Sequence, residues 1–172
     1  MNVKKAVRSS FERYGRVIAK SDDDALIKLR ALVEAELTKR GLLLNVGETG
    51  EKLCIEYFKS KAGLPKLLQS PPGAKNVDAL SRDGDRYSIK TFMKAKKTGT
   101  IYPDKDERKQ LFEYLLIVGL HTNYELKAIY RYSWEQFLSV RAWDKRMNAW
   151  YVPLSKKKLK FAEIVLEESP PD

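Results

Sequence analysis

Residues 114–120 form an uninterrupted apolar run, Tyr-Leu-Leu-Ile-Val-Gly-Leu. A run of this length without a charge is typical of a central strand that is covered on both faces. After a turn that contains His121, residues 126–132 alternate between apolar and polar side chains, which predicts a neighbouring strand. We expect His121 to be a loop residue rather than a catalytic base. The two strands predict an α/β fold with helices packed on a sheet.

Two helices are expected before the sheet begins. Residues 3–19 place apolar side chains at helical spacing among basic ones. Ser21 is the expected N-cap of a second helix, whose first turn holds three acids and which Gly41 ends. We interpret residues 1–44 as an N-terminal helical segment that acts as a cover, a dimerisation element or part of a DNA clamp.

Periodicity and turn signals predict the other elements around the central strand. In chain order these are a helix from about residue 48 to 62, an edge strand within 65–69, a brief strand at 101–102, a short helix from 103 to about 111, a helix capped by Ser133 and running to about 143, and a last strand at 150–152.

Residues 76–92 have the signature of a β-hairpin around a turn at 82–85. A two-residue Asp-Gly loop would put Lys90 and Asp78 on opposite faces. A three-residue loop with Gly84 in the left-handed conformation instead places Asp78 across from Ser88, with Lys90 on the same face. We prefer this register because it separates the polar side chains from the apolar ones.

An Asp, a hairpin turn, and then x-Lys on the second strand resemble the signature of the PD-(D/E)xK nucleases, the restriction-endonuclease-like superfamily. Asp78 matches the first carboxylate and Lys90 the lysine, and the ten-residue step from Asp78 to Ser88 fits compact type II restriction enzymes. Val77 replaces the proline of the family pattern, and Ser88 replaces its second acid. Ser-x-Lys members of the family supply the missing carboxylate from elsewhere. The resemblance covers about residues 45–135 and implies a mixed β-sheet flanked by helices.

The resemblance also implies a Mg²⁺-dependent catalytic site. Asp78 and the backbone carbonyl of Ile89 would bind the metal together with one relocated acid, Glu51 first and Asp104 second. Lys90 would orient the attacking water and offset the charge that develops on phosphorus. Ser88 would support the site by hydrogen bonding only.

The local sequence around each candidate acid also suggests a position for that acid in a helix. The apolar stripe of the third helix, Ile55 and Phe58, extends backwards by helical spacing to Glu51 and Glu48. Both glutamates also suit a helix N-terminus electrostatically. Asp104, like Glu107 after it, fits equally well as a solvated acid at a helix start.

The formal net charge of +10 and a pI near 9.6 favour a polyanionic partner, nucleic acid before membrane. Two basic segments are candidate contacts with the backbone of double-stranded DNA. The first directly follows Lys90 and the second lies near the C-terminus; their residues are Lys94, Lys96, Lys97 and Thr98, and Lys156 and Lys157.

The composition excludes other classes of protein. The single Cys54 and single His121 exclude a disulfide framework and leave a zinc site short of ligands. No apolar run reaches the length of a bilayer helix, and the N-terminus lacks a signal peptide's apolar core. We therefore expect a cytoplasmic protein without membrane contact. A single domain is expected over residues 1–172, with a nuclease-like core at 45–166 and a frayed tail at 167–172.

The sequence thus predicts a Mg²⁺-dependent DNA endonuclease, most simply a type II restriction enzyme acting as a homodimer. A structure-selective resolvase or a repair nuclease would use the same residues. An inactive DNA-binding protein on a nuclease-like fold is the alternative if Ser88 abolishes catalysis. A basic RNA-associated protein with an accidental hairpin match is the third, and finding Asp78 and Lys90 on opposite faces of the sheet would support it.

Overall fold

The computed structural model describes residues 3–42, 45–71, 73–104 and 109–168. The chain divides into two compact units, Met1–Leu44 and Asn45–Asp172. In the first unit, helices α1 (Val3–Ala19) and α2 (Asp23–Lys39) are joined by a tight turn. Asp22, not Ser21, is the N-cap of α2, because its Oδ1 accepts the backbone N–H of Ala25 at 2.8 Å. Gly41 ends the helix with φ +65°.

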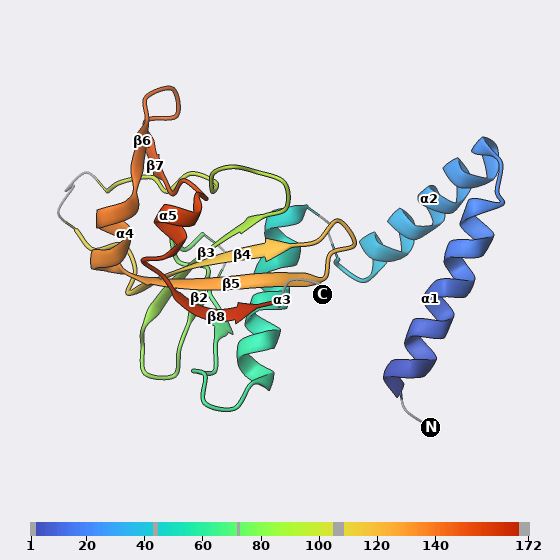
Figure 1. The fold of residues 1–172 in the computed structure, drawn as a ribbon, viewed down its shortest axis with the longest axis horizontal. Coiled ribbons are helices and arrows are strands. Elements are labelled where there is room, and N and C mark those ends of the chain that lie inside the picture. Colours follow the sequence, from blue (N-terminus) through green and yellow to red (C-terminus); the bar gives the residue numbers. More distant parts are fainter. Residues whose placement is uncertain (1–2, 43–44, 72, 105–108, 169–172) are drawn as a thin grey trace. The chain divides into compact units, whose positions relative to one another are not determined.

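The second unit is built on a six-stranded mixed sheet in the order β1-β2-β3-β4-β5-β8, shown in Figure 1. Strands β3 and β4 are parallel, and every other neighbouring pair is antiparallel. The strands of this sheet are β1 (Leu68–Gln69), β2 (Ala79–Leu80), β3 (Arg86–Phe92), β4 (Tyr114–Leu120), β5 (Leu126–Ser133) and β8 (Glu163–Glu167).

Both faces of the sheet are covered, which confirms the interpretation of β4 as a central strand. Leu116 and Val118 pack beneath helix α3 (Val46–Ser60), whose Phe58 is fully buried among them. Leu115 and Ile117 face the other way, toward helix α4 (Trp134–Val140) and a small second sheet. That sheet is a hairpin of β6 (Ala142–Asp144) and β7 (Ala149–Tyr151). A sheet that is covered on both faces in this manner is typical of an α/β fold.

Helix α3 begins at Val46, earlier than expected, because the side chain of Asn45 caps it by accepting the backbone N–H of Glu48 at 2.8 Å. Helix α4 starts after its expected cap, Ser133, but ends at Val140 instead of residue 143. Ile101 forms only an isolated bridge to Trp150. The short helix expected at 103–111 falls partly on residues 105–108, outside the described part of the chain.

The C-terminal region differs most from the expectation. Helix α5 (Lys156–Leu159) and strand β8 follow β7, and β8 forms one edge of the main sheet beside β5. Glu167, expected in a frayed tail, therefore lies in a strand and accepts a hydrogen bond from the hydroxyl of Tyr130 at 2.8 Å. Glu168 approaches His121 Nε2 at 2.6 Å. Residues 169–172 lie outside the described residues.

The starts of β3 and β4 are fixed to each other by an ion pair. The guanidinium of Arg86 donates to both carboxylate oxygens of Glu113 at 2.7 and 3.0 Å, and its backbone N–H donates to the same carboxylate at 2.6 Å. These bonds lower the pKa of Glu113. The pair anchors β3, the strand that carries Ser88 and Lys90. Within the described residues, no helix has the length and apolarity needed to cross a bilayer.

Candidate active site

The hairpin that carries the candidate site has the preferred register. Ala79 pairs with Tyr87 and Leu80 with Arg86, which sets Asp78, the residue before β2, across from Ser88. Gly84 adopts φ +91°, the left-handed conformation expected of the three-residue loop. The regular pairing of β2 with β3 ends at Ala79. The N–H of the residue before it, Asp78, donates to the carbonyl of Tyr87, the residue that Ala79 already faces. The side chain of Asp78 is thereby turned onto the next residues of β3.

The carboxylate of Asp78 is the point at which the polar groups of β3 meet. Its Oδ2 accepts the backbone N–H of Ile89 at 2.6 Å and the hydroxyl of Ser88 at 3.2 Å, and lies 3.5 Å from the amine of Lys90. Ser88 is completely buried, so it holds Asp78 from the interior. The side chains of Lys90 and Asp78 remain 19% and 25% exposed, so both reach solvent. Asp78 and Lys90 thus lie together, so the opposite-face arrangement that would have supported an accidental match is not found.

The backbone carbonyl of Ile89 points toward the same edge of β3 as Asp78. In a strand, the N–H and the C=O of one residue point to the same side, and the N–H of Ile89 is bonded to Asp78. The short strand β2 begins only at Ala79 and does not cover this part of β3. The carbonyl of Ile89, which the family resemblance implies as a metal ligand, therefore lies beside the carboxylate of Asp78.

Glu51 approaches this edge from helix α3. The helix packs very closely on β3: a Cβ added to Gly50 would lie 2.2 Å from Oγ1 of Thr91. Thr91 in turn donates to the carbonyl of Gly47 at 3.3 Å. Lys90, the residue before Thr91, belongs to the opposite face of the sheet. Glu51 and Lys90 therefore approach Asp78 from opposite sides of β3.

Burial and the neighbouring charges shift the pKa of Glu51. Partial burial and the negative charge of Asp78 raise its pKa, and Glu48 adds to the increase. A hydrogen bond from the side-chain amide of Gln69, at 3.3 Å, and the charge of Lys90 act in the opposite direction. The fold thus holds two carboxylates close enough to repel each other, and the positive charge of Lys90 partly offsets that repulsion.

The residues present fit Mg²⁺ better than a metal that needs a full protein cage. Mg²⁺ is commonly held by one or two carboxylates and completes its shell with water and phosphate oxygens. Asp78, Glu51 and the carbonyl of Ile89 are hard oxygen donors of this kind. The described residues contain no group of three or more His, Cys, Asp or Glu placed to hold a metal. Within the described part of the chain, a third acid therefore does not join Asp78 and Glu51.

Asp104 was the second candidate for the relocated acid. Its carboxylate forms an ion pair with Lys109 at 3.1 Å. Asp104 and Glu51 are alternatives for one position, and the described residues hold no group of three acids that would bring both to Asp78. The pKa of Glu51 responds to the charge of Asp78, which indicates that these two acids lie near each other. Glu107 lies outside the described residues.

The two predicted DNA-contact segments are fastened together by their backbones. The N–H of Leu154 donates to the carbonyl of Lys96, and the N–H of Thr98 donates to the carbonyl of Val152. This brings the basic loop after β3 next to the chain that leads into α5. Four of the six predicted contacts are exposed without a competing ion pair among the contacts described: Lys94, Lys96, Lys156 and Lys157.

The other two predicted contacts have structural roles. Thr98 is only 4% exposed, and its hydroxyl donates to the carbonyl of Gly99 and accepts the N–H of Val152. Its hydroxyl is therefore not presented to a phosphate. Lys97 forms an ion pair with Asp144 at 2.7 Å and lies over the ring of Tyr151. Both residues fix the loop rather than extend its basic surface.

Sequence reasoning did not identify two residues that position Glu51. Gln69 holds the carboxylate, and Gly50 permits the close approach of α3 to β3. A glycine inside a helix interior was the available signal for the second, because it costs helix stability unless a close packing contact requires it. Cys54, one turn after Gly50, is not a nucleophile: burial, together with the charge of Glu51, raises the pKa of its thiol to about 12.

Comparison with known proteins gives no relative from which a role can be transferred. No protein-family model matches the chain, and no curated protein matches it either. The function is therefore inferred from the geometry around Asp78.

Proposed function

We propose that this protein is a Mg²⁺-dependent DNA endonuclease with a restriction-endonuclease-like fold. The observation that carries the proposal is the meeting of Ser88, Ile89 and Lys90 at the carboxylate of Asp78, with Glu51 close enough for the two acids to repel each other. The register that produces this meeting is the one that the Ser-x-Lys nuclease pattern requires. The strand order, with β3 and β4 parallel in an otherwise antiparallel sheet, is compatible with that fold.

Asp78, Glu51 and the carbonyl of Ile89 would hold Mg²⁺, which supplies Lewis-acid polarisation of the phosphate and a lower pKa for a bound water. Among the described contacts of Asp78, the amine of Lys90 is the cation that approaches its carboxylate. Its amine would orient the attacking water and stabilise the negative charge that develops on the phosphate. Ser88 has no proton-transfer role in this scheme, because it is buried and bonded to Asp78. It fixes the orientation of the carboxylate.

The substrate would be double-stranded DNA. Lys94, Lys96, Lys156 and Lys157 would contact phosphates beside the site, consistent with the +10 net charge. Discrete cleavage at a short sequence would make the protein a type II restriction enzyme, whereas cleavage dependent on junctions or damage would make it a resolvase or repair nuclease. Cutting both strands with one site per chain calls for a symmetric homodimer.

The test is cleavage of mixed-sequence duplex DNA with and without Mg²⁺ by the wild type and by Lys90→Ala. Lys59→Ala, on the exposed end of α3, is the matched control because it removes the same charge from the same unit. We expect fragments that require Mg²⁺ in the wild type and in Lys59→Ala. Removal of a charge-stabilising group costs roughly a hundred- to thousandfold in rate, so Lys90→Ala should leave almost none.

A wild type that binds DNA in a salt-sensitive manner but never cleaves it would support the inactive DNA-binding protein instead. The absence of a third acid among the described residues is the feature that favours this alternative. Ser88→Asp would then test whether the missing acid is the cause. Equal cleavage by the wild type and Lys90→Ala would contradict the assignment of Lys90.

A further inference from the structure

The β6–β7 hairpin projects from the second unit, as Figure 1 shows at the upper left. Its strands pair Ala142 with Tyr151 and Asp144 with Ala149, so residues 145–148 form the tip. All four tip residues, Lys145, Arg146, Met147 and Asn148, are exposed. The tip therefore combines two cations, an apolar thioether and an amide at the most accessible end of a two-stranded ribbon.

The tip is held in one conformation by Asp144. Its Oδ1 accepts the backbone N–H groups of Arg146 at 3.1 Å and Met147 at 3.2 Å. Its Oδ2 accepts the amine of Lys97 at 2.7 Å, and these bonds lower the pKa of Asp144. Because these bonds restrain the backbone of the tip, binding a ligand there would cost less conformational entropy than binding to an unrestrained loop.

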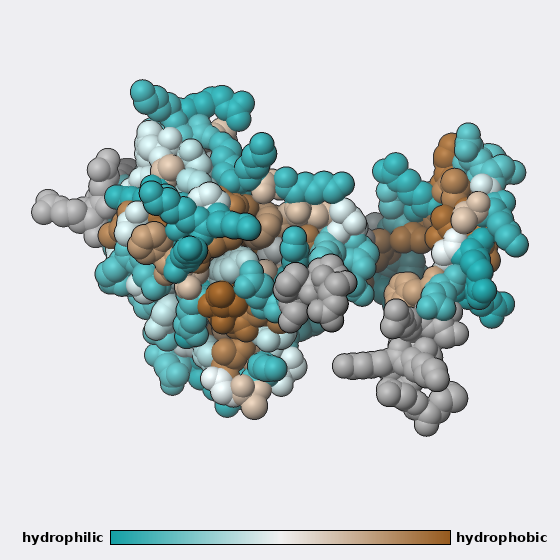
Figure 2. Space-filling view, viewed as in Figure 1, coloured by the Kyte–Doolittle hydropathy of each residue, from teal (hydrophilic) through white to brown (hydrophobic). Residues whose placement is uncertain are grey.

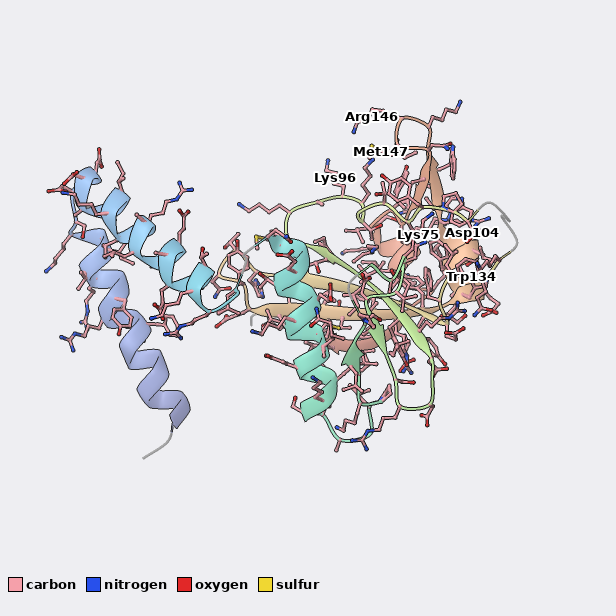
Figure 3. All side chains as sticks on the ribbon, turned by 180° about the vertical axis from the view of Figure 1, so that it is seen from behind. Lys75, Lys96, Asp104, Trp134, Arg146 and Met147 are labelled. Carbon is pink, nitrogen blue, oxygen red and sulfur yellow. The ribbon has the colours of Figure 1, made fainter. Side chains whose placement is uncertain are left out.

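The base of the hairpin is continuous with the basic loop that follows Lys90. Trp150 is buried against Phe137, forms a bridge with Ile101 and lies 3.9 Å beneath the guanidinium of Arg141. Lys97 bridges to Pro153 on the strand's continuation. Figure 3 shows Lys96, Arg146 and Met147 on the same side of the unit. The hairpin is thus fastened at its base to the basic loop that follows Lys90.

The charge of this side selects the class of partner. Asp144 is the only acid within residues 93–99 and 142–160, and Lys97 neutralises it. An ordinary solvated basic surface explains scattered lysines. It does not explain a preorganised ribbon with an arginine and an apolar side chain at its tip. The major groove of B-DNA accommodates a two-stranded β-ribbon, and arginine is the side chain that most often reads guanine there.

We propose that the β6–β7 hairpin enters the DNA major groove and reads base edges through Arg146, with Met147 in apolar contact with the bases. This inference deepens the proposed function, since it assigns the sequence-reading element of the same protein. Lys145 and the exposed lysines 94, 96, 156 and 157 contact phosphates and supply affinity without sequence information.

The experiment is selection of bound duplexes from a randomised pool by the full-length protein, with Ca²⁺ in place of Mg²⁺. The wild type, Arg146→Ala and Lys157→Ala are compared, and both side chains are exposed, so neither variant removes a buried contact. We expect the wild type to enrich a short sequence. Arg146→Ala should lose discrimination at a guanine position by roughly five- to a hundredfold. Lys157→Ala should weaken binding to all sequences and lower the salt slope by about one.

Unchanged base preference in Arg146→Ala would overturn the proposal, as would an unaltered preference when guanine at that position is replaced by 7-deazaguanine, which removes an acceptor in the major groove. Cleavage is assayed separately with Mg²⁺. A wild type that selects a sequence but never cuts would remove the endonuclease function and leave the hairpin assignment standing. A wild type that cuts without any base preference would do the reverse.

Discussion

Glu51 occupies a position that its own charge disfavours. Burial and the charge of Asp78 raise its pKa, and Gln69 and Lys90 compensate only in part. Fold stability alone gives no reason to keep an acid here, whereas a hard cation bound between the two carboxylates would reverse the repulsion. Stability and function therefore make opposite demands on this one residue.

Glu51→Gln should raise the stability of the metal-free protein at neutral pH, by up to about 1 kcal/mol given the screening of a half-exposed group. Because the pKa of Glu51 is raised above 4.5 in the folded protein, the folded state binds this proton more tightly than the unfolded state does. The stabilisation it provides is complete below pH 4.5 and is lost as the pH rises through the folded pKa. The advantage of the variant should therefore vanish in acid and grow toward neutrality, as chemical denaturation at several pH values would measure.

The same variant should lose most of the thermal stabilisation that Mg²⁺ gives the wild type, since a ligand stabilises only the state that binds it. Glu56→Gln is the control, because Glu56 lies exposed on the same helix. A rise in melting temperature with Mg²⁺ that is equal in Glu51→Gln and the wild type would remove Glu51 from the metal site. Loss of cleavage alone would not distinguish metal binding from misplacement of α3.

At the scale of elements, the position of the site depends on how closely α3 lies on β3. Gly50→Ala would place a methyl group 2.2 Å from Oγ1 and 2.3 Å from Cγ2 of Thr91. Alanine favours a helix by about 1 kcal/mol over glycine, but overpacking of this kind typically costs about 1–3 kcal/mol. We expect net destabilisation and reduced cleavage, because the helix that carries Glu51 must move away from β3.

Gly15→Ala in α1 is the matched control, since a Cβ there meets nothing within 4 Å. Gly15→Ala should be neutral or stabilising in a urea denaturation experiment. Replacing Thr91 by Gly in the Gly50→Ala background should recover stability by removing the side chain that is struck. A Gly50→Ala variant as stable as Gly15→Ala would mean that α3 and β3 are not in close contact.

The sequence predicted the elements whose patterns are governed by local physics. The apolar run of β4 required cover on both faces, and the polar residues around Asp78 sorted correctly in only one hairpin register. Strand β8 was missed because it has acids at both ends, Glu163 and Glu167, and owes its conformation to pairing with β5. Thr98 was predicted to contact a phosphate. It is instead buried and bonded to Val152, a residue distant in the sequence, so its local pattern did not reveal its burial. Long-range partners of this kind leave no mark in a local pattern.

At the scale of the whole molecule, the Met1–Leu44 unit presents apolar side chains that a stable helical pair would bury. Phe11 on α1 is 71% exposed and Leu32 on α2 is 68% exposed, and α2 has no buried residue. Figure 2 shows hydrophobic residues, in brown, at the surface of this helical unit. Two helices totalling so few residues do not bury enough surface to be stable alone, which calls for a partner.

We expect the partner to be a second copy of the same unit. α1 is predominantly basic, whereas Asp22 caps α2 and Asp23 and Asp24 lie in its first turn, so a twofold arrangement would bring the basic α1 of one chain beside the acidic start of α2 of the other. Leu26, Leu29 and Val33 are spaced along one face of α2 and would pack at the centre of the resulting four-helix arrangement.

The double variant Leu29→Lys/Val33→Lys should therefore be monomeric at concentrations where the wild type sediments as a dimer, with at least a tenfold weaker association. Phe161→Lys, which alters an exposed apolar residue of the other unit, should leave the dimer intact. If the dimer is also the form that cuts both strands, the double variant should nick duplex DNA and leave it unbroken, because each chain supplies one Asp78–Lys90 site. A double variant that remains dimeric would move the interface away from α2, and a wild type that sediments as a monomer would remove the twofold arrangement altogether.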